Sequence, residues 1–453
     1  MKKFDGISLK HIESLLESRQ EQALKKLIST LHPADIAEII NHLSKDEQKK
    51  RLFFLLDVEV ASDVIVELSG SIRMKILKEL AHDRLADIVE DLPSDEAADI
   101  IGDLPREKAN KVLEKIPFQE SVKVKRLLGY PEETAGGLMQ TEVLVFPATM
   151  TVEEAIKQIK KTASLSEGDY HTVFVVNEKR QPVGLISLHK LISADHSQML
   201  SQIMEKPPVL INVDEDREEI AKKFQKYDFV SAPVVDHSGV LLGRITIDDI
   251  MDVIEEETSE DFYRLAGTNV EEIVYGDNII KIAQIRLPWL LTNLFGGLLT
   301  GYLMWLFKVT LSHVLVLVTF IPVITGMGGN VGLQSSTISV RGWATGKISL
   351  HSFKHHLFKE VKVALLMASI CGFTVGLAAY LWHGYRFLGL VVGLSMFCAM
   401  NIAVLMGTLM PAILRWLGVD PAVASGPFVT TANDITGILV YMAVATVFLK
   451  YLG

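Results

Sequence analysis

Five long apolar segments fill the last third of the chain, and shorter periodic elements fill the rest. The apolar segments cover about 286–307, 312–340, 361–382, 386–411 and 426–449. A helix needs roughly 20 apolar residues to cross the hydrocarbon core of a bilayer. Each segment reaches that length, so we predict a five-helix transmembrane domain over residues 286–453.

Residues 1–135 are predicted to be helical throughout. Three segments, ELAHDRLADIVEDLP, SDEAADIIGDLP and REKANKVLEKIP, recur at roughly 12-residue spacing, and each ends in proline. Proline stops a helix, so this spacing predicts a stack of short helices, an all-α superhelical N-terminal domain. The helix faces are rich in aspartate and glutamate, either as a solvated acidic surface or as cation ligands.

Residues 136–254 contain an internal repeat, with copies at 136–200 and 201–254. FVVNEKRQPVGLISLHKLI in the first copy matches PVVDHSGVLLGRITIDDIM in the second, 59 residues on. A six-residue difference in length falls in the loop TASLSEGDY. Each copy is predicted to run helix, strand, turn, strand, helix. One copy cannot bury its apolar face alone, so the two should pack as one α/β unit.

Residues 255–285 are predicted to form a long helix that links this α/β unit to the first membrane span. Its start continues an acidic run, DDIMDVIEEETSED at 248–261. The N-terminal domain is acidic as well, so the two surfaces repel unless a divalent cation neutralises them. A rise in the concentration of that cation would draw the two surfaces together and favour one position of the linking helix. This arrangement predicts a cation sensor coupled to a gate.

Charge is divided sharply between the two halves. Residues 1–285 carry 52 acidic and 35 basic side chains, whereas residues 286–453 carry 3 and 10. An acidic polar half would repel phosphate, so we expect no nucleic-acid partner. The split also excludes a simple soluble enzyme and a disordered chain.

Basic residues between the second and third spans set the orientation. The five are Arg341, Lys347, Lys354, Lys359 and Lys362. Basic loops stay on the cytoplasmic side, so we predict a multi-pass protein of the cell (inner or plasma) membrane. Alternation of five spans then places the N-terminus in the cytoplasm and the C-terminus outside.

Of the three acidic residues in the membrane half, only Asp434 falls inside a predicted span; Glu360 lies in the basic loop and Asp420 in the GVDPA turn. A carboxylate at membrane depth costs roughly 2.5–3.5 kcal/mol and marks a functional site by default. The alternative is a structural role, through hydrogen bonds to neighbouring polar residues. Magnesium keeps most of its waters and needs one or two carboxylates, which Asp434 from each subunit of a symmetric homodimer would supply.

The glycine-rich stretch at 325–337 is a second candidate for pore lining. Gly328, Gly329 and Asn330 would offer backbone and amide oxygens there, and Thr431 would do so one turn before Asp434. Close helix packing through small residues is the competing interpretation of the glycines.

The repeat resembles a pair of CBS domains, a regulatory module that often binds adenine nucleotides. In that family an acidic residue after Ser or Thr holds the ribose. The second copy has Thr246 and Asp249, but the first has Ser187 and Lys190, which argues against a bound ATP. Tyr170 is the residue that would stack on the base.

The whole chain resembles the MgtE family of magnesium transporters. The matching motifs are SDEAADII, YPEETAGGLM, DFVSAPVVD, GLISLHKLISAD, PVITGMGGNVGLQSSTISVRG and GVDPAVASGPFVTTANDITGILVYMAVA. The resemblance implies a homodimeric magnesium channel that high cytosolic magnesium closes, with Asp434 as the pore carboxylate. It assigns sensor ligands to Asp63, Asp95, Asp99, Gly137, Asp216, Glu218, Asp228, Asp249, Asp252, Glu257, Glu260, Asp261 and Asp420.

Two positions depart from the family pattern or lack an interpretation in it. Leu333 stands where the family often has asparagine, and Asn433 next to the pore carboxylate has no assigned role. A transporter for another divalent ion (Mn²⁺ or Co²⁺), an ion-coupled exchanger and a membrane receptor that does not transport are the alternatives. An enzyme is not expected, because no nucleophile–base pair or zinc-type histidine cluster is present in the sequence.

Overall fold

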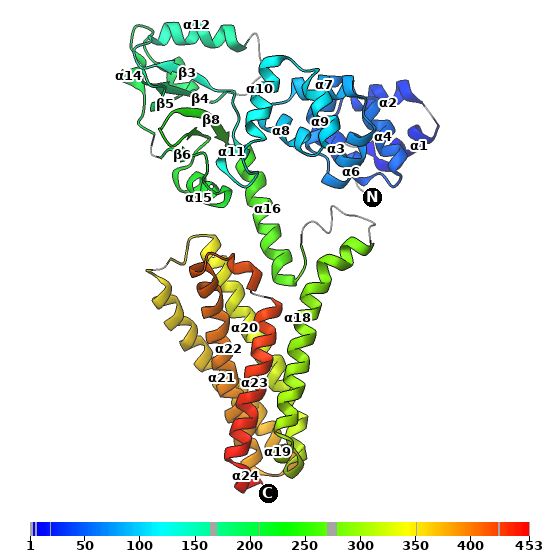
Figure 1. The fold of residues 1–453 in the computed structure, drawn as a ribbon, viewed down its shortest axis with the longest axis vertical. Coiled ribbons are helices and arrows are strands. Elements are labelled where there is room, and N and C mark those ends of the chain that lie inside the picture. Colours follow the sequence, from blue (N-terminus) through cyan, green and yellow to red (C-terminus); the bar gives the residue numbers. More distant parts are fainter. Residues whose placement is uncertain are drawn as a thin grey trace. The chain divides into compact units, whose positions relative to one another are not determined.

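The computed structural model describes residues 3–4, 7–18, 20–163, 170–207, 209–269, 279–349, 351–424 and 426–452. The chain divides into two compact units, Met1–Glu255 and Glu256–Gly453. Each unit is described by itself below, with the element labels of Figure 1.

Short helices stack on one another in the N-terminal part of the first unit, after a small hairpin of β1 (Lys3–Phe4) and β2 (Ile7–Ser8). The helices are α1 (Leu9–Glu17), α2 (Glu21–Ile28), α3 (Pro33–His42), α4 (Asp46–Phe54), α5 (Val58–Val66), α6 (Gly70–Glu79), α7 (His82–Asp91), α8 (Ser94–Gly102), α9 (Arg106–Leu113), α10 (Phe118–Leu127) and α11 (Ala135–Leu138). Contacts run from α3 to α5, from α5 to α7 and from α7 to α9. The predicted all-α domain is confirmed.

Each proline of the recurring motif stands at the N-cap of the next helix. Pro93, Pro105 and Pro117 precede α8, α9 and α10 with extended ψ angles of 136° to 153°. Proline has no N–H to lose there, and its restricted φ suits the start of a helix. The motif therefore marks where one helix stops and the next begins.

Two three-stranded sheets confirm the internal repeat. The first has β3 (Leu144–Pro147), β4 (Thr172–Val176) and β5 (Pro182–Ser187), with α12 (Val152–Ala163), α13 (Leu188–Ser193) and α14 (Leu200–Ile203). The second has β6 (Ile211–Asn212), β7 (Ser231–Val235) and β8 (Leu241–Thr246), with α15 (Arg217–Tyr227) and α16 (Ile247–Ala266). In both, the first two strands are parallel and the last two antiparallel, and an irregularity falls at Val175/Val176 and Val234/Val235. The extra residues of the first copy fall at 164–169, outside the described residues.

The helical stack and the second copy of the repeat share one hydrophobic core. It runs from Ile12 in α1 through the stack to Phe224, Ile245 and Val253. The first copy has a separate core around Val173 and Ile186. The second copy is therefore the one that is continuous with the N-terminal helices.

The second unit carries five helices whose length and apolar composition suffice to cross a membrane. Its elements are α18 (Ile279–Leu306), α19 (Lys308–His313), η1 (Leu315–Phe320), α20 (Ile321–Ala344), α21 (Phe353–His383), α22 (Arg386–Trp416), η2 (Pro421–Ala424), α23 (Pro427–Val447) and α24 (Leu449–Leu452). Helices α20, α22 and α23 pack on one another, α21 packs on α22, and α18 packs on α23 (Figure 1).

Two local predictions differ from the structure. The linking helix is not continuous over 255–285: α16 begins earlier, at Ile247, and ends at Ala266, before Gly267 with a φ of 77°, a left-handed conformation that ends helices. Residues 270–278 lie outside the described residues, and helix resumes at Ile279.

The predicted basic loop between the second and third spans is mostly helix too, so Glu360 lies on α21 and is only 6% exposed.

Candidate ion-binding sites

Helix α23 carries Asp434, the predicted pore carboxylate, on a partly buried face. The helix begins with Pro427 in its first turn, which suits a residue without an N–H. Asp434 is half-buried, whereas its neighbour Asn433 is 1% exposed. In the described part of the chain no lysine or arginine forms an ion pair with Asp434. Among the described residues, therefore, no basic side chain neutralises this carboxylate.

The glycines of α20 form a close crossing with α23. A Cβ at Gly329 would lie 3.5 Å from Thr430 Cγ2, and one at Gly332 would lie 1.8 Å from Asn433 Nδ2. Gly328 is buried against the same helix, whereas Asn330 is exposed. The close contacts of these glycines with α23 are those expected for helix packing, the competing interpretation, whereas the side chain of Asn330 is exposed.

Thr431, a predicted pore-lining residue, is engaged by the first span. Its hydroxyl donates to Asn293 Oδ1 of α18 at 3.0 Å. A Cβ at Gly296, one turn further along α18, would lie 2.0 Å from Thr431 Cγ2. Asn293 and Gly296 thus dock the first span onto α23, one turn before Asp434. Neither residue was singled out in the sequence.

The acidic surfaces of the first unit converge on one region. Asp63 belongs to α5, and Asp95, Glu96 and Asp99 belong to α8. Asp248, Asp249 and Asp252 belong to the first turns of α16. Asp63, Asp99, Asp248 and Asp249 all act electrostatically on Glu96. We call these seven residues the acidic cluster.

Burial and like charge raise the pKa values of the innermost members of the acidic cluster. Burial, followed by the charges of Asp249 and Glu96, holds the pKa of Asp95 well above its ordinary value. Burial and the charges of Asp249 and Asp63 raise the pKa of Glu96 to about 7. Burial raises the pKa of Asp249 to about 6 although Thr246 Oγ1 donates to it at 2.5 Å. The cluster therefore disfavours its own ionised state.

A divalent cation fits this cluster by the chemistry of its donors. Asp95 is 6% exposed, and its Oδ1 is buried without a hydrogen-bond partner. An orphaned carboxylate oxygen inside a group of like charges is the kind of donor that Mg²⁺ prefers. In the conformation described, no three His, Cys, Asp or Glu residues among the described ones stand at metal-binding distance around one point. Binding would thus require the side chains to close in.

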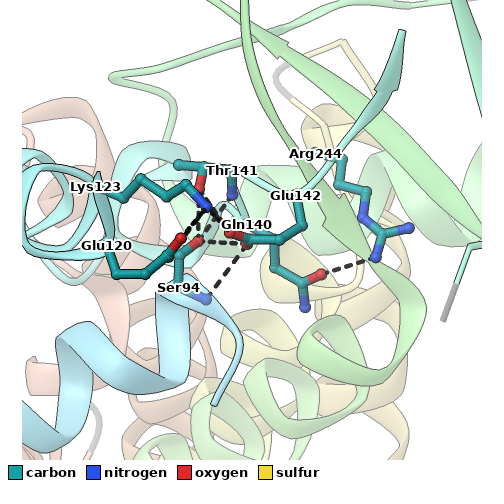
Figure 2. Close-up of polar contacts among 7 residues, drawn as sticks. All are labelled: Ser94, Glu120, Lys123, Gln140, Thr141, Glu142 and Arg244. Atoms are coloured by element: carbon teal, nitrogen blue, oxygen red, sulfur yellow. Dashed lines mark hydrogen bonds and ion pairs between the residues drawn. The ribbon is translucent and has the colours of Figure 1, made fainter. Parts of the chain in front are cut away.

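A polar network beside the acidic cluster ties the helical stack to the repeat (Figure 2). Ser94 Oγ donates to Glu142 Oε2 at 2.7 Å, and Lys123 Nζ lies 3.1 Å from Glu142 Oε1 and 2.9 Å from Glu120. Burial would raise the pKa of Glu142, but these hydrogen bonds and the Lys123 charge lower it overall. Glu142 therefore joins α8 and α10 to the start of the repeat as an anion.

A second group of predicted ligands lies around α15. Asp216 is the N-cap of that helix and accepts from Glu218 N at 2.9 Å, and Thr134 forms an isolated bridge with it. The bridge brings Gly137, at the end of the same turn, into this neighbourhood. Glu218 pairs with Lys222 at 3.0 Å, and Asp228 caps the other end of α15 with a φ of 51°. Asp228 is thus separated from Asp216 by the length of the helix.

The remaining predicted ligands belong to the second unit. Glu257, Glu260 and Asp261 lie half-buried on the last turns of α16. Asp420 precedes η2 and forms an ion pair with Arg264 of α16, which also pairs with Glu260. A guanidinium therefore lies between two of the carboxylates that the resemblance assigns to a cation.

The residues that the CBS resemblance assigns to a nucleotide already contact other side chains of the protein. The guanidinium of Arg244 lies 5.0 Å from the centre of the Tyr170 ring. Lys190 of the first copy pairs with Glu205 at 2.7 Å, whereas Asp249 of the second copy is held by Thr246. A carboxylate is therefore present at the position that the CBS resemblance assigns to the ribose in the second copy, and one face of the Tyr170 ring is covered.

Sequence reasoning missed several residues that the structure joins to these sites. Glu142 and Asn293 gave no local signal, because partners such as Ser94 and Thr431 are far away in the chain. Arg264 has a near partner in Glu260, but its contact with Asp420 joins residues 156 positions apart. Glu360 did give a local signal, because it lies four residues after His356 on the same helix. The segment SSTIS (335–339) on α20 supplies hydroxyl groups. Ser335 donates to Glu360 at 3.1 Å, and Ser339 lies 3.1 Å from His356 Nε2.

Family models match three parts of the chain. The divalent cation transporter model MgtE matches residues 321–444, the MgtE intracellular N domain matches 31–133, and the CBS domain matches 135–197 and 200–256.

Curated relatives cover most of the chain. The magnesium transporter MgtE of Enterococcus faecalis is 39% identical over 327 residues, 72% of each chain. That of Bacillus subtilis is 31% identical over 438 residues, 97% of this chain and 96% of its own.

A solved structure resembles the first unit. It is the crystal structure of the cytosolic domain of the Mg²⁺ channel MgtE in complex with ATP. It is 33% identical with a TM-score of 0.50, and it covers 53% of this chain and 99% of that one. With relatives of this identity over nearly its full length, and with the helical domain, CBS pair and five membrane helices in the family's order, the chain belongs to the MgtE family of divalent cation transporters.

Proposed function

We propose that the chain forms a homodimer that admits Mg²⁺ into the cytoplasm down the membrane potential. The observation that carries this is Asp434, a carboxylate on a membrane-spanning helix with no basic partner among the described residues. A single carboxylate offers too few oxygens for a dehydrated ion, but two related by a two-fold axis suit a hydrated Mg²⁺. Asn330 of α20 and Thr431, one turn before Asp434 on α23, are polar residues that would line the same path. The curated relatives are magnesium transporters by name, which supports Mg²⁺ as the cargo.

The driving force would be the electrical potential. Each elementary charge that crosses gains about 2.3 kcal/mol per 100 mV, so a divalent ion gains about twice that. In this arrangement the N-terminus is cytoplasmic and the C-terminus outside, as the basic residues near the start of α21 favour.

Cytosolic Mg²⁺ would close the channel by binding to the acidic cluster. Ionised, the cluster repels itself, as the raised pKa values of Asp95, Glu96 and Asp249 indicate. A divalent cation removes that repulsion and holds α5 and α8 on the start of α16. Because α16 runs from the acidic cluster to Ala266, and the chain then leads to the first span, which begins at Ile279, fixing the first turns of α16 would restrict the channel. Glu257 and Asp261, further along α16, and the group of Gly137, Asp216 and Glu218 would add ligands.

Flux measurements test both parts of the proposal. The intact protein is reconstituted in vesicles with an imposed inside-negative potential, and Mg²⁺ uptake is followed while Mg²⁺ on the cytoplasmic side is stepped from low to high. We expect uptake that falls as this Mg²⁺ rises, and loss of uptake in Asp434→Ala. Asp195→Asn, an exposed aspartate of the CBS pair, is the matched control and should behave as the wild type.

Normal uptake by Asp434→Ala would overturn the pore assignment. Uptake of Mn²⁺ or Co²⁺ in preference to Mg²⁺ would overturn the assignment of Mg²⁺ as the cargo. Uptake that does not change with cytoplasmic Mg²⁺ would overturn the assignment of the acidic cluster as a sensor.

ATP is a second ligand that one observation favours. The solved structure that resembles the first unit contains ATP, and Asp249 is placed on Thr246 as a ribose-binding carboxylate would be. The base would stack on the ring of Tyr170 and would take the place that the Arg244 guanidinium has there. Titration of ATP into the protein, followed by tyrosine fluorescence, should give saturable binding that Tyr170→Ala weakens; no saturation would exclude it.

A further inference from the structure

One guanidinium joins the end of α16 to the turn that precedes α23. Arg264 Nη1 donates to Asp420 Oδ2, and Arg264 Nη2 donates to Glu260 Oε1. The other oxygen of Asp420 accepts from Ala422 N at 2.8 Å. Both oxygens of Asp420 therefore have donors within the protein.

A tight apolar seam runs beside this ion-pair network. A Cβ at Gly426 would lie 2.4 Å from Leu265 O, and one at Gly267 would lie 3.2 Å from Pro427 Cγ. Trp289 of α18 packs on the first turn of α23, with its ring 6.0 Å from that of Phe428. The end of α16 thus lies against the start of the helix that carries Asp434, with almost no room for side chains between the backbones.

We propose that Arg264 is a built-in cation that holds this contact in place of a metal ion. The inference rests on the proposed function, because the contact matters for transport only if α16 restricts the channel. Glu260 and Asp420 are two carboxylates for which the family resemblance implies an ion, and here the single positive charge of the arginine between them offsets part of their negative charge. Arg264 is a positioning residue, since it touches neither the cargo nor Asp434.

An arginine differs from a bound ion in what it responds to. Its guanidinium stays protonated at any physiological pH and its local concentration is fixed, so the contact does not depend on Mg²⁺. A metal ion at Asp420 would have to displace Arg264 and then lie beside a like charge. Mg²⁺ sensing is thereby left to the acidic cluster and the other proposed ligands, and Arg264 sets the Mg²⁺ concentration that closure requires.

Variants of both partners test this by flux. The intact protein in vesicles is compared as wild type, Arg264→Gln, Asp420→Asn, the double variant and Arg264→Lys. We expect each single variant to raise the Mg²⁺ concentration of half-closure by about two- to fivefold, the range that partly exposed ion pairs allow. The double variant should shift it no further than either single one, because both remove the same interaction. Lys keeps the charge without the forked geometry, so Arg264→Lys should restore part of the shift.

A second readout needs no transport. Phe262, two residues before Arg264, is 70% exposed and offers a chymotrypsin site on α16. Arg264→Gln and Asp420→Asn should speed cleavage there at low and high Mg²⁺ alike, because the lost contact is independent of Mg²⁺. Lys157→Gln, which breaks an exposed ion pair within α12, is the control and should leave both the cleavage rate and half-closure unchanged.

Three results would overturn the proposal. The first is a shift of half-closure in Asp420→Asn without one in Arg264→Gln, and the second is easier closure in Arg264→Gln; either would mean that Asp420 holds an ion. The third is unchanged cleavage in both variants. If the wild type itself shows no Mg²⁺-regulated flux, the proposed function fails, and the cleavage rates alone decide whether Arg264 holds the contact.

Discussion

Replacing Asp95 by asparagine should stabilise the metal-free protein and weaken its response to Mg²⁺. Asp95 is the most buried member of the acidic cluster, and its Oδ1 has no hydrogen-bond partner. Asparagine has nearly the same shape and lacks the charge. The substitution therefore removes the repulsion toward Glu96 and Asp249 and also removes one anionic ligand.

The size of the effect is set by the charges that act on Asp95. Burial is the largest cause of its raised pKa and persists in the variant, and the charges of Asp249 and Glu96 come next. We therefore expect relief of repulsion to contribute about 1–2 kcal/mol to the free energy of unfolding, within the range for an unpaired buried polar or charged group. For a unit of this size that raises the midpoint of thermal unfolding by roughly 2–8 °C.

The sign of the pH dependence is opposite to ordinary acid denaturation. Asp95, Glu96 and Asp249 have folded-state pKa values above their unfolded ones. The stability that their protonation contributes is fully present below about pH 4 and is lost as pH rises through about 6 to 7. Without metal, the wild type should thus be more stable at pH 5.5 than at pH 7.5, and this difference should shrink in Asp95→Asn.

Thermal unfolding of the intact protein in detergent measures all of this, in chelator and in millimolar Mg²⁺ at both pH values. Asp46→Asn is the matched control, because Lys75 lowers the pKa of Asp46 and this change should not stabilise the protein. A lower midpoint for Asp95→Asn in chelator, or an undiminished gain from Mg²⁺, would refute the reasoning.

Three further substitutions test the packing and the polar contacts. Glu142→Gln should destabilise the first unit by about 1–3 kcal/mol in denaturant unfolding, because it removes the charge that Ser94 and Lys123 bind and leaves Lys123 with Glu120 alone; an unchanged midpoint would contradict this. Gly332→Ala should cut the yield of monodisperse protein in size-exclusion chromatography, since its Cβ would lie 1.8 Å from a buried amide, whereas Gly326→Ala meets nothing within 4 Å and should be neutral. Glu360→Ala should lower the thermal midpoint in detergent and Glu360→Gln should do so far less, because only glutamine keeps an acceptor for the Ser335 hydroxyl; equal losses would count against the hydrogen bond.

Local pattern was enough to predict most of the fold. Membrane spans can be recognised by their length and apolar composition, because a helix that crosses the bilayer must be long and apolar over one continuous segment. The CBS-like repeat was visible because two copies under the same packing constraint keep the same spacing, and the equivalent strand irregularities at Val175 and Val234 confirm it. The linking helix was predicted too long, because helical periodicity on both sides concealed the left-handed Gly267 between them.

The parts of this protein can be recognised without its coordinates: an acidic helical domain, a CBS pair, five spans and one carboxylate inside the last of them. Each part is identified by residues that lie close together in the sequence. The long-range contacts came from the fold: Asp95 and Glu96 meet Asp249, Arg264 pairs with Asp420, and Gly332 receives the side chain of Asn433. These partners lie about 100 residues or more apart along the chain. Contact between such residues depends on how whole helices and strands pack together, and the local periodicity of the sequence holds no information on that packing.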